Sequence, residues 1–175
     1  TVVCVKEQEI ETKHGQFNVK WFNDLLDNKM HCVLQKGDIT TPLPVRVYDP
    51  DPLVDILNIS KDYSSCELGD AMDYIQKEGS GVIIILDRAN SGQIIYEKMQ
   101  VLSPNGKLSK SKFIKTDDTF KNIGAGSRIL RALGASDLKV LGAAHNYTGL
   151  DGFGLNILSY VNLAESFGIK DKVEI

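Results

Sequence analysis

The sequence predicts a mixed α/β domain, in which a sheet of mixed strand directions is flanked by helices. Apolar and polar residues alternate over 16–22, as in a half-buried strand. Residues 82–86 form a continuous apolar, mostly β-branched run, as in a strand covered on both faces. Between such segments, apolar residues recur at helical spacing. With 175 residues and no internal repeat, we expect a single domain over 1–175.

The first part of the chain is predicted to be mainly strands. Residues 1–13 alternate loosely and are expected to form an edge strand or a linker into the domain. The strands over 16–22 and 30–35, joined by a polar connection, predict an antiparallel hairpin. A strand over 44–48 follows and ends at a turn with two Asp-Pro pairs, 49–52.

A short amphipathic turn with Leu53, Ile56 and Leu57 comes next. Ser64 and Glu67 then form a capping-box pattern, which predicts that a helix begins at residue 65. Its apolar face is expected to consist of Leu68, Ala71, Met72 and Ile75, and Gly79 and Gly81 to stop it.

The strand over 82–86 leads into the loop 87–92, at the strand end where open α/β sheets usually bind ligands. A helix is predicted over 120–133, capped at its start by Thr119 or a neighbouring aspartate and at its end by Gly134. Short strands are expected over Leu138–Gly142 and Leu155–Val161, completing the mixed sheet.

Composition excludes several classes of protein. The net charge of −3 and a pI near 5.6 give no broad basic surface, so we expect no nucleic-acid partner. No apolar run approaches the roughly 20 residues that span a bilayer, and the first residues lack a signal-peptide pattern. Cys4, Cys32 and Cys66 are widely spaced and odd in number, which favours a reducing compartment, the cytoplasm.

Seven short motifs follow one another along nearly the whole chain. They are T-x-x-G-x-F at 12–17, G-D-I at 37–39, P-V-R-V at 44–47, L-x-x-A-M at 68–72, G-x-G-V-I-I at 79–84, G-x-G-x-x-I-L-x-x-L-G at 124–134 and G-L-D-G-F-G at 149–154. In this order the motifs resemble those of the GTP cyclohydrolase II family, which carries out the first committed step of riboflavin synthesis. The resemblance implies the mixed-sheet fold of that family.

The resemblance also places a metal site, and this chain departs from it. In the family three cysteines hold a zinc ion that activates water, and their positions fall here on Asp51, Asp62 and Ser64. A serine hydroxyl is a poor zinc ligand at neutral pH. Asp51 and Asp62 could hold a hard cation such as Mg²⁺, but Asp51 precedes Pro52 and is better explained as a helix N-cap. We expect no metal or cofactor in this domain.

The nucleotide-contact positions implied by the resemblance are altered as well. The family's R-x-E-G-R loop falls on 87–91, where Asp87 and Arg88 are candidates for nucleotide binding or form a local salt bridge. Its T-N-N-P-x-K phosphate stretch falls on 141–147, which contains neither threonine nor lysine. Arg46 alone is retained at a nucleotide-contact position.

The catalytic positions implied by the resemblance carry other residues. The D-x-R pair of the family, its base and its phosphate-linking arginine, falls on Thr119 and Lys121. A glycine pair at 124–127 could cradle a phosphate at a helix start, but it lacks the lysine of a phosphate-binding loop and is more typical of close packing. We therefore expect no catalytic residues.

Three functional hypotheses remain. The first is a degenerate domain that acts as a structural, dimerisation or regulatory module. By resemblance, it would follow in cis a 3,4-dihydroxy-2-butanone 4-phosphate synthase domain that uses Mg²⁺, in a homodimer. The second is an active GTP ring-opening hydrolase with a metal on Asp51, Asp62 and Cys66. The third is a module that senses a nucleotide or flavin precursor.

Overall fold

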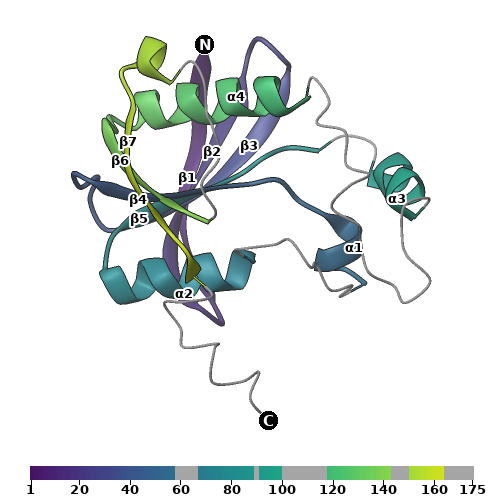
Figure 1. Ribbon diagram of the computed structural model, residues 1–175, viewed down its shortest axis with the longest axis horizontal. Helices are drawn as coiled ribbons and strands as arrows, with labels where there is room; N and C mark the ends of the chain where they lie inside the picture. Colours follow the sequence, from purple (N-terminus) through teal and green to yellow (C-terminus); the bar gives the residue numbers. More distant parts are fainter. Residues whose placement is uncertain (58–66, 89–90, 100–117, 143–149, 164–175) are drawn as a thin grey trace.

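The computed structural model describes residues 1–57, 67–88, 91–99, 118–142 and 150–163 (Figure 1). In chain order the elements are β1 (Val2–Thr12), β2 (Gly15–Asp24), β3 (Lys29–Lys36), β4 (Leu43–Tyr48), α1 (Pro52–Asp55), α2 (Leu68–Glu78), β5 (Gly81–Ile85), α3 (Ser91–Met99), α4 (Asp118–Ala132), β6 (Asp137–Leu141), the 3₁₀ turn η2 (Asp151–Phe153) and β7 (Asn156–Val161).

The described strands form one sheet in the order β1-β2-β3-β5-β4-β6-β7. β1, β2 and β3 make an antiparallel meander, and β3 pairs antiparallel with β5. β4 pairs in parallel with both β5 and β6, and β6 pairs in parallel with β7. α2 lies against one face of the sheet and α4 against the other (Figure 1). This arrangement confirms the predicted mixed α/β fold.

Each face of the sheet buries its own apolar core. Because side chains alternate along a strand, Val82 and Ile84 of β5 point toward α4 while Ile83 points toward α2. Ile129 of α4 joins the first core and Ile75 of α2 joins the second. β5 is therefore covered on both faces, as its continuous apolar run predicts.

The predictions for the N-terminal strands are confirmed. Residues 2–12 form the edge strand β1, and the hairpin of β2 and β3 pairs Trp21 with Cys32. In α2, Ala71, Met72 and Ile75 are buried as predicted.

One prediction about the helices that follow β4 is wrong. α2 begins at Leu68 rather than at residue 65, because its N-cap residue Glu67 has an extended backbone (φ −79°, ψ 161°). The Glu67 side chain makes no capping hydrogen bond. The short amphipathic turn is apolar but only partly inward. Leu53 is fully buried, whereas Ile56 and Leu57 are 71% and 53% exposed, because α1 ends at Asp55 and the chain turns away from the core.

The second half of the chain contains a helix that the sequence patterns did not predict, α3, whose weakly amphipathic sequence gives little signal. α4 begins at Asp118, so Thr119 lies inside the helix and does not cap it. Gly124 and Gly126 lie in the middle of α4, so the glycine pair is not at a helix start. A Cβ on Gly126 would lie 3.2 Å from Val47, which indicates close helix–sheet packing.

Two glycines bring the end of β3 against the end of α2. Gly79 ends α2 with a left-handed backbone (φ 80°), and Gly37 follows β3 with φ 63°. A Cβ on Gly37 would lie 2.3 Å from the carbonyl oxygen of Gly79. Within the described residues, no helix is long and apolar enough to span a membrane.

Candidate functional site

The topology creates a crevice at the carboxyl ends of β4 and β5. These two strands are parallel neighbours, and the chain leaves β4 for α2 on one face and leaves β5 for α4 on the other (Figure 1). Open α/β sheets bind ligands where adjacent strands send their connections to opposite faces. The residues that follow β4 and β5, in the ranges 49–52 and 86–88, therefore form the candidate site.

A two-pronged ion pair joins the two strand ends. Arg88, after β5, donates from Nη2 to Oδ2 of Asp49, after β4, at 2.6 Å, and its Nε donates to the other carboxylate oxygen. The predicted local salt bridge between Asp87 and Arg88 is wrong, because the guanidinium reaches across the crevice to Asp49. Planar pairing of this kind is the strongest geometry available to an arginine and a carboxylate.

Asp87 is bound to strand β3 rather than directed at a ligand. Its Oδ2 accepts a hydrogen bond from Met30 N–H at 3.1 Å, and its own N–H donates to Nδ1 of His31 at 3.0 Å. His31 is 2% exposed, and burial lowers its pKa although Asp24 and Asp87 partly oppose this. The Nε2 atom of His31 has no hydrogen-bond partner in the described part of the chain.

A second ion pair lies beside His31 and ties α4 to the sheet. Arg128 of α4 donates from Nη2 to Oδ2 of Asp24, which is fully buried at the end of β2. The Nη2 atom of Arg128 also lies 3.7 Å from Oδ2 of Asp27. Oδ1 of Asp24 accepts from Leu26 N–H at 3.0 Å. Burial alone would raise the pKa of Asp24, but these hydrogen bonds and the Arg128 charge outweigh it, so the pKa is lowered.

Asp51 caps helix α1, as its sequence context predicts. Its backbone is extended (φ −124°), its Oδ1 accepts from Leu53 N–H at 3.2 Å, and it is 2% exposed. Its N–H donates to Oδ2 of Asp55 at 2.8 Å, and the other oxygen of Asp55 accepts from the Tyr48 hydroxyl. Burial and the neighbouring Asp55 raise the pKa of Tyr48.

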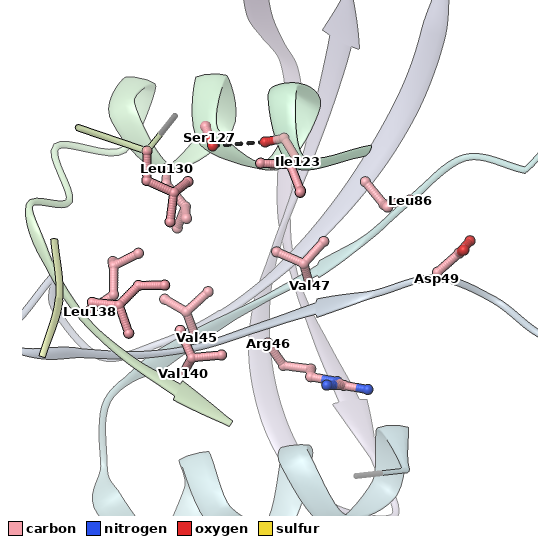
Figure 2. Close-up of a pocket in the computed structure, with 13 residues that line it drawn as sticks. Val45, Arg46, Val47, Asp49, Leu86, Ile123, Ser127, Leu130, Leu138 and Val140 are labelled. Atoms are coloured by element: carbon pink, nitrogen blue, oxygen red, sulfur yellow. Dashed lines mark hydrogen bonds between the residues drawn. The ribbon is translucent and has the colours of Figure 1, made fainter. Parts of the chain in front are cut away.

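Arg46 lies on the opposite side of β4 from the apolar residues around it. Figure 2 shows its side chain pointing away from Val45 and Val47. Its Nη1 donates to the carbonyl oxygen of Leu141 at 3.1 Å, which links β4 to the end of β6. The charge of Arg46 is thus directed at the backbone end of a neighbouring strand.

The structure does not describe all of the remaining residues that the sequence predicts for the metal and catalytic positions. Asp62, Ser64 and Cys66 lie outside the described residues. Thr119 and Lys121 lie in the first turn of α4, where the structure describes the backbone but not these side chains. In the parts of the chain that are described, no three His, Cys, Asp or Glu side chains converge as a metal site would require.

Two hollows flank the crevice. One has a volume of about 210 Å³ and lies between α4 and strands β4 and β6 (Figure 2). Its lining is mainly aliphatic, with Arg46, Asp49 and Ser127 as polar members. Ser127 donates to the Ile123 carbonyl at 2.7 Å. The other, of about 720 Å³, lies on the α2 side and includes four carboxylate residues. They are Asp55, Glu67, Asp70 and Asp73.

The sequence patterns missed Asp49 and His31, although both bind the candidate residues. Asp49 could have been found, because it directly follows a predicted strand, as Asp87 and Arg88 do. His31 gives no such signal, since it occupies an inward position of a strand in which an apolar residue is the ordinary choice. Its role depends on the pairing of β3 with β5, which brings it beside Asp87.

The fold and the crevice define a class of mixed α/β domains with a site at the carboxyl ends of its central strands. Within that class, the chain belongs to the GTP cyclohydrolase II family, whose model matches residues 3–162.

Several curated proteins are similar to this chain. A 3,4-dihydroxy-2-butanone 4-phosphate synthase of Neisseria meningitidis serogroup B is 31% identical over 86% of this chain and 40% of its own. One of Pseudomonas syringae is 29% identical over 92% of this chain and 44% of its own. The riboflavin biosynthesis protein RibBA of Chlorobium phaeovibrioides is 27% identical over 90% of this chain and 40% of its own.

A solved structure has the same fold. It is RibBX, a two-domain 3,4-dihydroxy-2-butanone 4-phosphate synthase from A. baumannii, which superposes with a TM-score of 0.62 at 18% identity. The match covers 92% of this chain and 40% of that one. The chain therefore spans less than half of the length of the relatives that it matches.

Proposed function

We propose that this domain is a GTP cyclohydrolase II-like module without catalysis of its own, and that it serves a 3,4-dihydroxy-2-butanone 4-phosphate synthase domain in the same chain as a structural, dimerisation or regulatory part. The observation that carries the proposal is the Asp49–Arg88 ion pair. It joins the two strand ends at the point where a ligand would enter the crevice.

The neighbouring polar groups support the same proposal, because each has a structural task. Asp51, at a position where the family has a zinc ligand, caps α1. Asp87 binds β3, and Arg46 binds the end of β6. A catalytic site needs its charged groups directed at the substrate, and these are directed at the backbone.

The charge of the larger hollow also disfavours the binding of a nucleoside triphosphate. Its lining carries four carboxylates against Lys13 and His14, and His14 already pairs with Asp73 at 2.6 Å. A cleft whose lining is mostly of one sign repels ligands of that sign. The excess of carboxylates in this hollow would therefore repel the negatively charged phosphates of GTP.

Metal analysis of the purified protein, together with formate release from GTP in the presence of added Zn²⁺ or Mg²⁺, tests the proposal. We expect neither stoichiometric metal nor turnover. Stoichiometric zinc with formate release would instead establish the active hydrolase.

The variant Asp51→Asn sharpens the result. Asparagine caps a helix as well as aspartate does, so stability and metal content should both be unchanged if Asp51 is only a cap. Asp51→Ala should lower the free energy of unfolding by about 1 kcal/mol. A loss of bound metal in Asp51→Asn would contradict the capping role.

The sensing hypothesis is favoured by one observation, the aliphatic hollow of about 210 Å³ beside the Asp49–Arg88 pair. A ligand that binds only the folded state raises the melting temperature. Thermal unfolding with GTP and with flavin precursors would reveal such binding, and we expect no shift.

The names of the relatives support a synthase domain in cis. Several are called 3,4-dihydroxy-2-butanone 4-phosphate synthase although each is more than twice as long as the part that matches this chain. We accordingly propose that the module lies in cis with a synthase domain. The homodimer, the cytoplasmic location and Mg²⁺ confined to the synthase domain stay predictions from the family resemblance. Mass measurement by light scattering tests the dimer.

A further inference from the structure

Large apolar side chains are exposed together at one end of the sheet. Their exposed fractions run from 42% to 67%. They are Val3 and Val5 of β1, Leu25 and Leu26 of the β2–β3 turn, and Met30 of β3, and we call them the N-terminal patch. Single exposed apolar residues are ordinary, but a group of this kind marks an interaction surface.

Strand register places two members of the patch, Val3 and Met30, on one face of the sheet. Val3 pairs with Asn23, and Asn23 pairs with Met30, so these three side chains form one row across the sheet. Val5 follows Val3 in β1 at a β-bulge, where the register with β2 shifts between Cys4 and Lys6. Leu25 adjoins the start of the strand, because its N–H donates to the carbonyl oxygen of Thr1 at 3.0 Å.

The fold covers only the opposite face at this end of the sheet. α4 covers that face and is held there by the Arg128–Asp24 pair. α2 lies on the same face as the patch but near the β1–β2 turn, where Asp73 contacts His14 and Gln76 donates to the Gln16 carbonyl. Among the described elements, none is placed by such a contact over the patch (Figure 1).

The edge strand carries protective charges over only part of its length. Lys6, Glu7, Glu9 and Glu11 line the second half of β1, whereas residues 2–5 contain no charge. Charged side chains on an exposed edge prevent pairing with other chains. The uncharged half is the half that contributes to the patch, which is expected if another part of the molecule covers it.

We propose that the N-terminal patch is the docking surface for the synthase domain in cis; this inference rests on the proposed function. The matched relatives are more than twice as long as the part that this chain covers, and RibBX has two domains. A domain joined ahead of Thr1 would be tethered beside Leu25. Tethering raises the effective concentration to about the millimolar range.

Size also favours a tethered domain over a second copy. A stable interface between separate proteins buries at least roughly 1,000 Å² in total with good complementarity. The patch consists of five side chains, which is a small centre for such an interface. A linked domain needs a smaller contact area than a separate protein. The linker already restricts its translational freedom, so less of that freedom is lost when the domain docks.

The patch also adjoins the crevice, because Met30 N–H donates to Asp87. A domain docked on the patch would thus contact the end of β3 that holds Asp87. The occupant needs an apolar surface that matches the patch, with polar groups at its rim.

Covalent footprinting of the full-length chain, with a small carbene reagent and mass spectrometry, tests the proposal. Leu158 of β7 and Ile56 after α1 serve as internal references, at 59% and 71% exposed. We expect Leu26 and Met30 to be labelled several-fold less than these references. Labelling of the patch at the level of Leu158 would overturn the proposal.

Two matched variants identify the occupant. Leu26→Lys and Leu158→Lys each place a charge at an exposed leucine, so neither should disturb the fold. We expect Leu26→Lys to restore labelling of Met30 at unchanged molecular mass, and Leu158→Lys to have no effect. A fall in mass by half with Leu26→Lys would assign the patch to a second copy and overturn the proposal. Formate release from GTP would refute the proposed function, whereas the footprint reports on docking alone.

Discussion

At the scale of single residues, the buried carboxylate of Asp24 has the most demanding environment in the candidate region. It is fully buried, and its two oxygens accept from Arg128 and from Leu26 N–H. A buried ion pair adds little net stability relative to an apolar pair, but removal of one partner leaves a buried charge without compensation. Asp24 is therefore a position where a small change has a large effect.

We predict that Asp24→Asn lowers the free energy of unfolding by about 3 kcal/mol, because Arg128 loses its buried counter-charge and keeps only the partly exposed Asp27, at 3.7 Å. Asp73→Asn is the matched control. The Asp73 side chain is 51% exposed, so its pair with His14 should contribute less than about 1 kcal/mol. Urea unfolding measures both. Equal losses in the two variants would contradict the buried-pair argument.

The same substitution should flatten the acid side of the stability profile. The pKa of Asp24 is lowered in the folded protein, so the charged form stabilises the fold. That contribution is complete above the ordinary aspartate pKa of about 3.9 and is lost as the pH falls further, through the folded pKa. Urea midpoints measured between neutral pH and acid should therefore decline less steeply in Asp24→Asn.

His31 imposes a second pH dependence, in a different range. Burial lowers its pKa, so the neutral imidazole stabilises the fold. This contribution is present above the ordinary histidine pKa of about 6.5 and is lost as the pH falls from there through the folded pKa. Protonation would also turn Nδ1 into a donor and remove the acceptor of Asp87 N–H.

The variant His31→Asn isolates this effect. Asparagine presents an oxygen where Nδ1 lies and has no proton to gain, so it should lose less stability than the wild type between about pH 7 and pH 5. The measurement is the urea midpoint at intervals across that range. Parallel profiles for the two proteins would show that His31 does not titrate as proposed.

At the scale of the elements, the contact between the end of β3 and the end of α2 depends on two glycines. Gly37 and Gly79 both have a left-handed backbone, but only Gly37 lacks room for a side chain. Gly79→Ala should cost about 1–2 kcal/mol, the ordinary penalty for that backbone. Gly37→Ala should cost about 2–5 kcal/mol, because its Cβ also meets the Gly79 carbonyl. Chemical denaturation would refute this if the costs were equal.

The elements that could be predicted are those whose periodicity matches their burial. β5 is covered on both faces and has a continuous apolar run, and α2 has one apolar face and one buried face. α3 has a weak apolar pattern, so nothing local distinguishes it. The start of α2 was misplaced because Ser64 and Glu67 satisfy the capping pattern, whereas the backbone at Glu67 is extended. A local motif therefore does not fix a helix boundary when tertiary contacts favour another one.

At the scale of the whole molecule, the fold class and the family followed from the order of the motifs, and the family match confirms them. The contacts of the candidate site did not follow. Arg88 binds Asp49 because two strands that are distant in sequence are neighbours in the sheet. Asp87 binds β3 for the same reason. Strand pairing decides such contacts, and local patterns do not encode it.

The mixed sheet also sets an order of assembly. β1, β2 and β3 pair through short connections, so they can form early and leave a ribosome as a local unit. β4 has no such opportunity, because both of its partners, β5 and β6, follow it in the chain and are joined through long crossovers. β4 therefore completes its pairing only after β6 has been synthesised. Until β6 arrives, one of its edges is open to pairing with other chains, and assembly is most exposed to aggregation there.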